Sequence, residues 1–210
     1  MQHKINFSKN GANLQAIPNF LEIKNILWIK QTFVPQTRVR LLYDSSALFL
    51  HFEVRDCFVR SIETQTNGKV WEDSCVEFFF APNPDFPSRY FNLEINAGGT
   101  ALMRYNLVPR TKYIEIEPED IAQFNIKSIL PKRIDAEIKT PVIWTIQCRI
   151  PFETLKKYAP IETPKEGKKW RANFYKTASN NSNPHYISWH KINAERPDFH
   201  RPEFFGEFTF

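Results

Sequence analysis

The sequence has little of what marks several large classes of protein. Only six of its 210 residues are glycine while fifteen are proline, which predicts stiff, ordered connections rather than flexible linkers. No apolar run reaches the roughly 18 residues that indicate a membrane-spanning helix. The GxSxG, HExxH and glycine-rich phosphate-loop motifs are also missing. The sequence therefore predicts no membrane span and carries none of these common hydrolase or nucleotide-binding signatures.

Cysteine is scarce, with three residues at Cys57, Cys75 and Cys148. They form no CxxC pair and show no ligand-like spacing, which argues against a zinc site. All three lie in apolar, strand-like segments, where a free thiol packs as a small apolar group. We expect buried free thiols, although one disulfide with a leftover thiol also fits the count.

A large excess of charge of one sign is missing too, since the net charge is only +5. The densest basic cluster is Lys165, Lys168 and Lys169, and acidic residues lie among the other basic ones. Proteins that bind nucleic acids concentrate positive charge on one face, so we expect neither a nucleic-acid nor a membrane partner. Residues 1–12 are polar and show no export signal, which predicts a cytoplasmic protein unless such a signal was removed.

Short segments with alternating apolar and polar residues run through most of the chain, separated by proline-rich turns. We expect strands at 37–43, 47–55, 89–97, 100–107, 112–116, 124–130, 133–139, 142–150, 170–178, 186–191 and 204–210. Proline followed by spaced apolar residues predicts short helical turns at 151–158 and 118–123. The pattern predicts an all-β fold, an antiparallel β-sandwich of the jelly-roll or immunoglobulin-like kind. We expect one domain over 1–210, with 1–36 as an extension packed on it.

The segment 70–80 carries a carboxylate in the middle of an apolar strand. Val76, Phe78 and Phe80 alternate onto one face, so Glu77 points to the other. A lone charge among apolar groups is costly to bury without a partner. Glu77 is therefore either paired with a structural cation or directed at a polar ligand.

Two other expected strands would add polar side chains to the same face as Glu77. Arg171 and Asn173 alternate with apolar residues, as do Asn92 and Glu94. Together they predict a polar, carboxylate-bearing sheet face. A solvated face, or a cross-strand pair between Arg171 and Glu94, would produce the same alternation.

Six segments resemble, in order, the motifs of family 9 carbohydrate-binding modules. They are 38–44 with 47–56, 71–79, 90–100, 150–155, 170–175 and 198–206. The resemblance runs from about residue 37 to the C-terminus. It implies a jelly-roll-like sandwich that binds sugars without cleaving them.

The resemblance also implies a sugar held in a slot between two tryptophans. Trp71 matches the first, and Trp189 matches the second, with Trp170 as its rival. Aromatic faces cover the apolar C–H face of a sugar, and charged or amide groups bind its hydroxyls. The expected carbohydrate-binding residues are Trp71, Glu77, Arg104, Arg171, Asn173 and Trp189.

Other functions remain open at this point. Glu77 with Glu72 or Asp73 would make a glycosidase pair, and Met103 with a histidine would hold a b-type haem, as related sandwiches do. A ligand-free protein-interaction domain is a further alternative. We expect no cofactor except a structural calcium ion, for which the candidate ligands are Asp56, Asp73 and Asp85.

Overall fold

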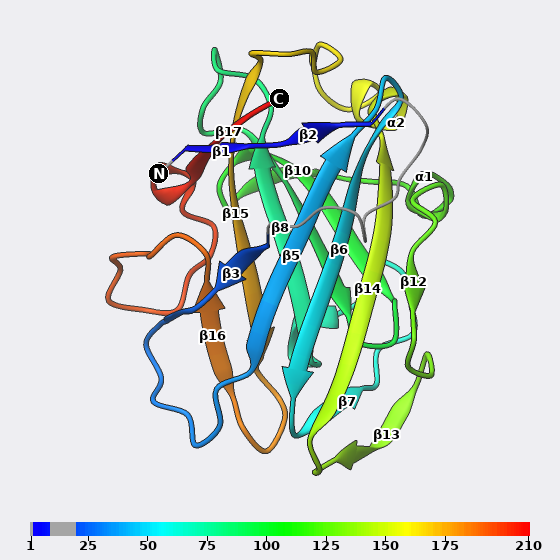
Figure 1. Cartoon of the computed structure of the whole chain (residues 1–210), viewed down its shortest axis with the longest axis vertical. Coiled ribbons are helices and arrows are strands. Elements are labelled where there is room, and N and C mark those ends of the chain that lie inside the picture. Colours follow the sequence, from blue (N-terminus) through cyan, green and yellow to red (C-terminus); the bar gives the residue numbers. More distant parts are fainter. Residues whose placement is uncertain (1, 9–19) are drawn as a thin grey trace.

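The computed structural model describes residues 2–8 and 20–210, in which strands dominate (Figure 1). The strands are β1 (Gln2–Lys4), β2 (Asn6–Phe7), β3 (Leu21–Ile23), β4 (Asn25–Ile26), β5 (Gln36–Tyr43), β6 (Ala47–Asp56), β7 (Val59–Ser61), β8 (Cys75–Ala81), β9 (Tyr90–Asn96), β10 (Ala101–Val108), β11 (Lys112–Glu115), β12 (Lys127–Ser128), β13 (Ile134–Ile138), β14 (Val142–Pro151), β15 (Lys169–Ala178), β16 (His185–Ser188) and β17 (Gly206–Thr209). The short helices are α1 (Pro118–Ala122) and α2 (Phe152–Lys156), and η2 (Val70–Glu72) and η3 (Pro202–Phe204) are 3-10 turns. No helix in the described ranges has the length and apolar character that crossing a membrane requires.

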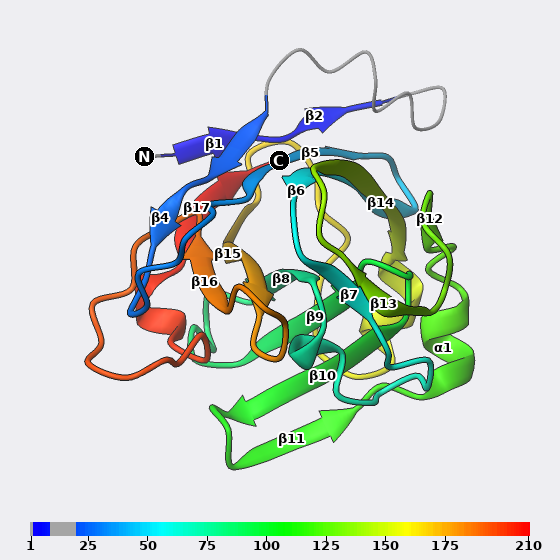
Figure 2. The ribbon, with the colours of Figure 1, turned by 90° about the horizontal axis from the view of Figure 1, so that it is seen from below.

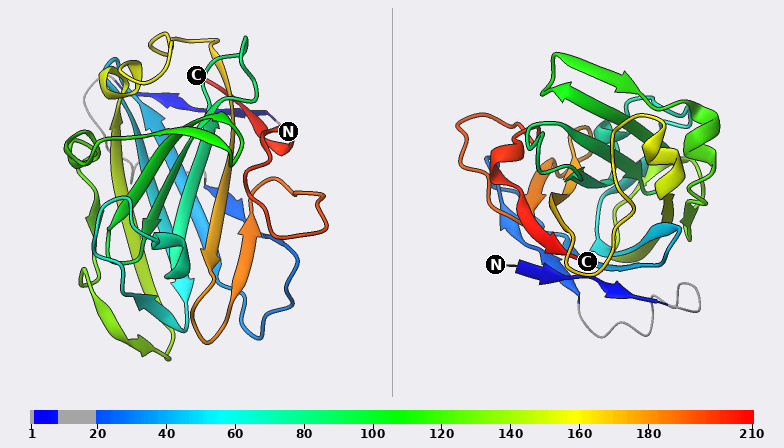
Figure 3. Two further views of the ribbon diagram at one scale, coloured as in Figure 1. Left: turned by 180° about the vertical axis from the view of Figure 1, so that it is seen from behind. Right: turned by 90° about the horizontal axis from the view of Figure 1, so that it is seen from above.

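Two sheets pack face to face and confirm the predicted β-sandwich (Figures 2 and 3). The first sheet has the order β1-β17-β15-β8-β9-β10-β11, with β16 beside β15 and β4 beside β16. The second has the order β12-β14-β6-β5-β2, with β3 also on β5, and β7 pairs separately with β13. The pairs β1–β17 and β2–β5 are parallel, whereas the other pairs of the described strands are antiparallel.

Alternating side chains fill the space between the sheets, as the sequence predicted. Phe78 and Phe80 of β8 stack on each other, and Phe78 also stacks on Phe174 of β15 at a centroid distance of 4.8 Å. Trp144 and Trp170 are fully buried here, and Trp170 stacks on Phe80 with an interplanar angle of 8°. Trp170 is therefore part of the core, and its ring has no open face for a sugar.

The first long hairpin forms where the sequence placed it, between β5 and β6. Its turn is fixed by Asp44, whose Oδ1 accepts the backbone N–H groups of Ser46 and Ala47 at 2.6 and 2.8 Å. The strand expected over 124–130 is wrong in extent, because only β12 pairs with β14. Asn125 has a left-handed φ of 54°, which interrupts an extended segment there.

The N-terminal residues contribute strands to both sheets in the ranges that the structure describes. In residues 2–8, β1 lies beside β17 and β2 beside β5. In residues 20–36, β3 joins β5 and β4 joins β16. The expectation was that residues 1–36 pack on the sandwich. Residue 1 and residues 9–19 lie outside the described ranges, so for them it stays a prediction.

The cysteine prediction is confirmed. Cys57, Cys75 and Cys148 are buried, free thiols. Burial raises the pKa of the Cys75 and Cys148 thiols, so neither is a ready nucleophile.

Candidate functional site

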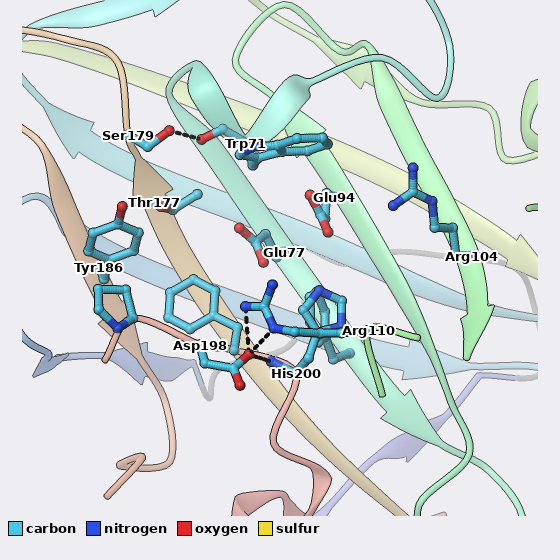
Figure 4. A pocket seen from close by; sticks show the side chains of 13 residues that line it. Trp71, Glu77, Glu94, Arg104, Arg110, Thr177, Ser179, Tyr186, Asp198 and His200 are labelled. Atoms are coloured by element: carbon cyan, nitrogen blue, oxygen red, sulfur yellow. Dashed lines mark hydrogen bonds and ion pairs between the residues drawn. The ribbon is translucent and has the colours of Figure 1, made fainter. Parts of the chain in front are cut away.

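A cavity of about 380 Å³ lies on the outer face of the first sheet, the face turned away from the second sheet (Figure 4). The strands β8, β9, β10 and β15 supply its floor, and η2, β16 and the 197–200 loop supply its walls. Its lining residues are Trp71, Glu77, Phe79, Glu94, Arg104, Arg110, Thr177, Ser179, Tyr186, Pro197, Asp198, Phe199 and His200.

Two carboxyl groups form the centre of the floor. Glu77 of β8 and Glu94 of β9 lie directly opposite each other in the strand register, and they are only 3% and 5% exposed. The Asn92 amide donates a hydrogen bond to Glu94 Oε1 at 2.9 Å. In the described part of the chain, no hydrogen bond or ion pair involves the Glu77 carboxyl group, and the only opposite charge that lowers its pKa is that of Lys176. Glu77 therefore presents both oxygens to the cavity.

Burial raises the pKa of both floor residues, because it disfavours their charged forms. The pKa of Glu77 lies well above its ordinary value, and the neighbouring Glu94 charge raises it further. The pKa of Glu94 is raised to about 7, although the Asn92 hydrogen bond and the charges of Arg104 and Arg110 oppose the shift. The pair therefore retains a proton near neutral pH.

One wall is the half-buried ring of Trp71, in the turn η2. The turn is held by Asp73, whose Oδ2 accepts the backbone N–H groups of Ile62 and Glu63, each at 2.9 Å. The Ser179 hydroxyl donates to the backbone oxygen of Trp71 at 3.2 Å. These bonds hold the turn η2 in place, and Figure 4 shows the Trp71 indole close to the carboxyl groups of Glu77 and Glu94.

The opposite wall comes from the segment 197–200. Phe199 stacks on Tyr175 at 4.1 Å with an interplanar angle of 8°. The Nδ1 atom of His200 lies 2.6 Å from the Tyr90 hydroxyl group. Burial lowers the pKa of His200 to about 4, so its imidazole is neutral at physiological pH. This wall offers aromatic surface and no positive charge from histidine.

Two arginines flank the carboxyl pair. Arg104 of β10 lies 3.4 Å from Glu115 through its Nε, and its guanidinium sits 4.4 Å from the centre of the Tyr113 ring. Arg110, in the turn between β10 and β11, has a left-handed φ of 61° and donates through Nε to Asp198 at 2.7 Å. This ion pair joins the turn to the 197–200 wall.

Three of the six predicted site residues meet in the cavity, namely Trp71, Glu77 and Arg104. Two others, Asn173 and Arg171, lie outside the cavity and form hydrogen bonds with backbone groups. Asn173 is buried and exchanges hydrogen bonds with the backbone of His190, at 3.0 and 2.9 Å. Arg171 donates to the backbone oxygens of Glu203 and Phe205.

The sixth, Trp189, lies on the core side of β15. Its ring stacks on Phe208 at 5.1 Å with an interplanar angle of 17°, and it also contacts Phe174. Both phenylalanines face the space between the sheets. The structure therefore does not bring Trp189 opposite Trp71.

Several lining residues were missed by the sequence prediction. Glu94 was assigned to the polar face but not to the site, because its position opposite Glu77 depends on the strand register. Arg110 and Asp198 lie outside the strands, where periodicity gives no signal, and Tyr186 lies within the short strand β16. The segment 198–206 did belong to the family resemblance, which was the available clue to this wall.

A second buried charged group lies on the inner face of β15. The Lys176 Nζ atom lies 3.3 Å from Asp56 Oδ2 and 2.7 Å from His185 Nε2, and both charged side chains are fully buried. Trp144 donates its indole N–H to the same Asp56 oxygen at 3.3 Å. Burial lowers the pKa of Lys176, whereas Asp56 opposes the shift. This group, which we call the Lys176 cluster, is satisfied by protein partners.

The candidate calcium ligands are occupied or scattered. Asp56 belongs to the Lys176 cluster, the Oδ2 atom of Asp73 accepts three protein N–H donors, and Asp85 is exposed in a loop. Residues 2–8 and 20–210 contain no group of three or more His, Cys, Asp or Glu side chains placed to hold a metal ion. Met103, the candidate haem ligand, is buried in the main core.

Comparison with known proteins identifies a family that this chain matches. The sequence profile of carbohydrate-binding family 9 matches residues 8–210. An extracellular protein of Arthroderma benhamiae is 28% identical over 182 residues, which cover 84% of this chain and 79% of the relative.

Solved structures agree with the fold. A provisionally assigned carbohydrate-binding protein from Bacteroides uniformis matches with a TM-score of 0.88 and 27% identity, covering 100% of this chain and 98% of that one. A family 9 module from Caldicellulosiruptor kristjanssonii in complex with cellotriose matches with a TM-score of 0.63 and 15% identity, covering 100% and 93%. The same kind of module in complex with glucose matches with a TM-score of 0.62 and 16% identity, covering 100% and 95%.

Proposed function

The chain belongs to carbohydrate-binding family 9, and on this premise we propose that the cavity between Trp71 and the 197–200 wall binds a saccharide without cleaving it. The observation that carries the proposal is the Glu77 carboxyl group. It is almost completely buried, has no partner among the described residues and faces the cavity. A buried polar group of this kind costs stability unless a ligand completes its hydrogen bonds.

The binding chemistry follows from the positions of the lining groups. The indole of Trp71 covers the apolar C–H face of a sugar ring, because it offers apolar area and a negatively polarised face. The floor carboxyls of Glu77 and Glu94 accept hydrogen bonds from the sugar hydroxyls, and the protonated member of the pair donates one. Arg104 and Arg110 donate N–H groups to the hydroxyl oxygens on the other side of Glu94.

The second aromatic surface in this proposal is the wall at Phe199 and His200, together with Tyr186. A clamp of Trp71 with Trp189, as the family resemblance implies, would require Trp189 to leave its stack on Phe208. Asn173 and Arg171 act in this proposal by holding the backbone near the walls, through the hydrogen bonds described above. The substitution Trp189→Phe distinguishes the two arrangements, since it retains core packing and alters only a direct indole contact.

The carboxyl pair does not by itself make a hydrolase. A glycosidase needs one protonated and one ionised carboxyl group on either side of the scissile bond. Glu77 and Glu94 instead lie next to each other on the floor, and burial favours the neutral form of both. We therefore expect no product release from aryl glycosides or oligosaccharides, and product release that Glu77→Gln abolishes would contradict the non-catalytic proposal.

Binding is tested with a glycan array followed by calorimetry. Glucose and cello-oligosaccharides are natural first probes, because family 9 modules of the same fold are known in complex with glucose and cellotriose. The Trp71→Ala variant should weaken binding at least tenfold, since it removes the stacking surface. Phe49→Ala is the matched control, because Phe49 is a half-buried aromatic on the outer face of the second sheet. Equal affinity of wild type and Trp71→Ala would contradict the proposal.

A further inference from the structure

The hairpin formed by β10 and β11 extends the cavity face to the edge of the first sheet. Figures 2 and 3 show this hairpin at the rim of the molecule, beyond β9. In the register, Tyr113 lies opposite Asn106, and Glu115 lies opposite Arg104. Since Arg104 lines the cavity, the side chains of Tyr113 and Glu115 share its face of the sheet.

Tyr113 is an exposed aromatic ring beside a residue of the cavity. It is 44% exposed, and the Arg104 guanidinium lies 4.4 Å from the centre of its ring. The Arg104 contact orders the ring before any ligand binds, and the exposed part of Tyr113 remains open to solvent. Nothing in the core packing of the hairpin uses Tyr113, because Ile114 is the residue paired with the inward-facing Tyr105.

The polar groups around Tyr113 are suited to a second sugar. Glu115 and Arg104 form an ion pair at 3.4 Å on the same face, which leaves both acceptor and donor atoms beside the ring. An exposed aromatic with such neighbours matches the two-sided character of a pyranose, apolar on its face and polar at its rim. From β9 to β11 the sheet advances two strand spacings, about 9.6 Å at roughly 4.8 Å each. A ring resting on Glu77 and Glu94 does not span that distance, whereas the next unit of an oligosaccharide extends toward it.

We propose that Tyr113 is the platform of a second sugar subsite, reached past Arg104, so that the preferred ligand is an oligosaccharide rather than a monosaccharide. This inference rests on the proposed saccharide binding in the main cavity. Arg104 has a double role in it, because it borders the main cavity through its guanidinium and supports the Tyr113 ring. Glu115 completes the subsite as an acceptor for hydroxyl groups.

Calorimetric titration with saccharides of one to four units tests the proposal. The panel contains the gluco-, xylo- and chito-oligosaccharide series together with their monosaccharides. In the wild type, affinity should rise about tenfold from one unit to three, a change of about 1.4 kcal/mol in binding free energy. In Tyr113→Ala that gain should vanish while the affinity for the monosaccharide stays unchanged, and Tyr113→Trp should preserve or increase the gain.

Ile114→Ala is the matched control. It truncates an apolar residue of the same strand that is 41% exposed but belongs to the opposite face. It should leave the dependence on chain length intact, and unfolding curves of each variant establish that the hairpin remains folded. An equal chain-length gain in wild type and Tyr113→Ala overturns the subsite, as does a wild type that binds one and three units equally well. If no saccharide of the panel binds at all, the proposed function itself fails, and the subsite fails with it.

Discussion

The two faces of the first sheet carry buried ionisable groups in opposite circumstances. On the inner face of β15, the Lys176 cluster gives each buried charge a protein partner. On the outer face of β8, Glu77 is nearly as buried but has no partner in the described residues, and its nearest charged neighbour of the same face is another carboxyl group. The strands β8 and β15 are adjacent, so the same part of the sheet holds both.

The difference separates an ionisable group that is paired for structure from one that is left open for a ligand. A cation beside Glu77, like the Lys176 ammonium beside Asp56, would have given its carboxyl group a partner within the protein. Instead, Glu77 faces an open cavity under Trp71. Burial alone therefore does not identify a functional charge, whereas burial without a partner at the floor of a cavity does.

The largest effect in this comparison is expected on the free energy of unfolding, from a substitution in the Lys176 cluster on the inner face. Asp56→Asn should lower the free energy of unfolding by about 3–5 kcal/mol, because it leaves the Lys176 charge buried without a counter-ion. Saccharide affinity, measured below the unfolding transition, should stay unchanged. Chemical denaturation and calorimetry provide the two readouts.

The double substitution of Asp56→Leu with Lys176→Met sharpens this test. It replaces both charges with apolar groups, so it should recover most of the lost stability. A loss below about 1 kcal/mol in Asp56→Asn, or a loss of affinity without loss of stability, would show that the Lys176 cluster is not the structural group of the comparison.

A smaller effect, on the order of 3 kcal/mol, is expected from pH on the outer face. The pKa of Glu94 is raised from 4.5 to about 7 in the folded protein, so the folded state binds the proton more tightly than the unfolded chain. This contribution to stability is complete below pH 4.5 and is lost as the pH rises through about 7. Urea denaturation at a series of pH values measures it.

Glu94→Gln is the control for that series, because an amide does not titrate. The difference between the wild-type and variant curves removes the contribution of the histidines, which titrate in the same window. Parallel curves for the two proteins would show that the floor carboxyl pair does not hold the proton inferred for it.

The smallest of these effects concerns Glu77 as a ligand contact. Glu77→Gln preserves shape but replaces a carboxyl oxygen, which can accept or donate, with an amide nitrogen that only donates, so saccharide affinity should fall about tenfold, or about 1.4 kcal/mol. The thermal midpoint should hold or rise, because a buried carboxyl without a partner is removed. Glu72→Gln, a neighbouring substitution at a residue outside the cavity lining, should change neither quantity.

Much of the fold was readable from the sequence because strands with one buried face impose a period of two. That period placed the hairpin of β5 and β6, and it placed Glu77 on the face opposite Phe78. It also placed Glu94 on the same face, but the pairing of Glu94 with Glu77 depends on the register between β8 and β9. Register depends on turn geometry and on the whole buried face, which no single segment reveals.

The rest of the candidate site could not be predicted in this way. Arg110 and Asp198 meet across 88 residues from irregular segments, where no periodicity reports which way a side chain points. Trp189 shows a different limit, since an indole suits a core as well as a sugar-binding surface. The motif that contains Trp189 does not show whether its ring faces Trp71 or stacks on Phe208, as it does in the structure.

The ion pair between Arg110 and Asp198 has a consequence for biosynthesis. One wall of the cavity comes from residues 197–200, and the segment that follows enters the first sheet as β17, between β1 and β15. During translation the floor strands leave the ribosome well before this wall does. A nascent chain should therefore remain unable to capture ligand until residues 197–200 have been synthesised and have packed beside the floor strands.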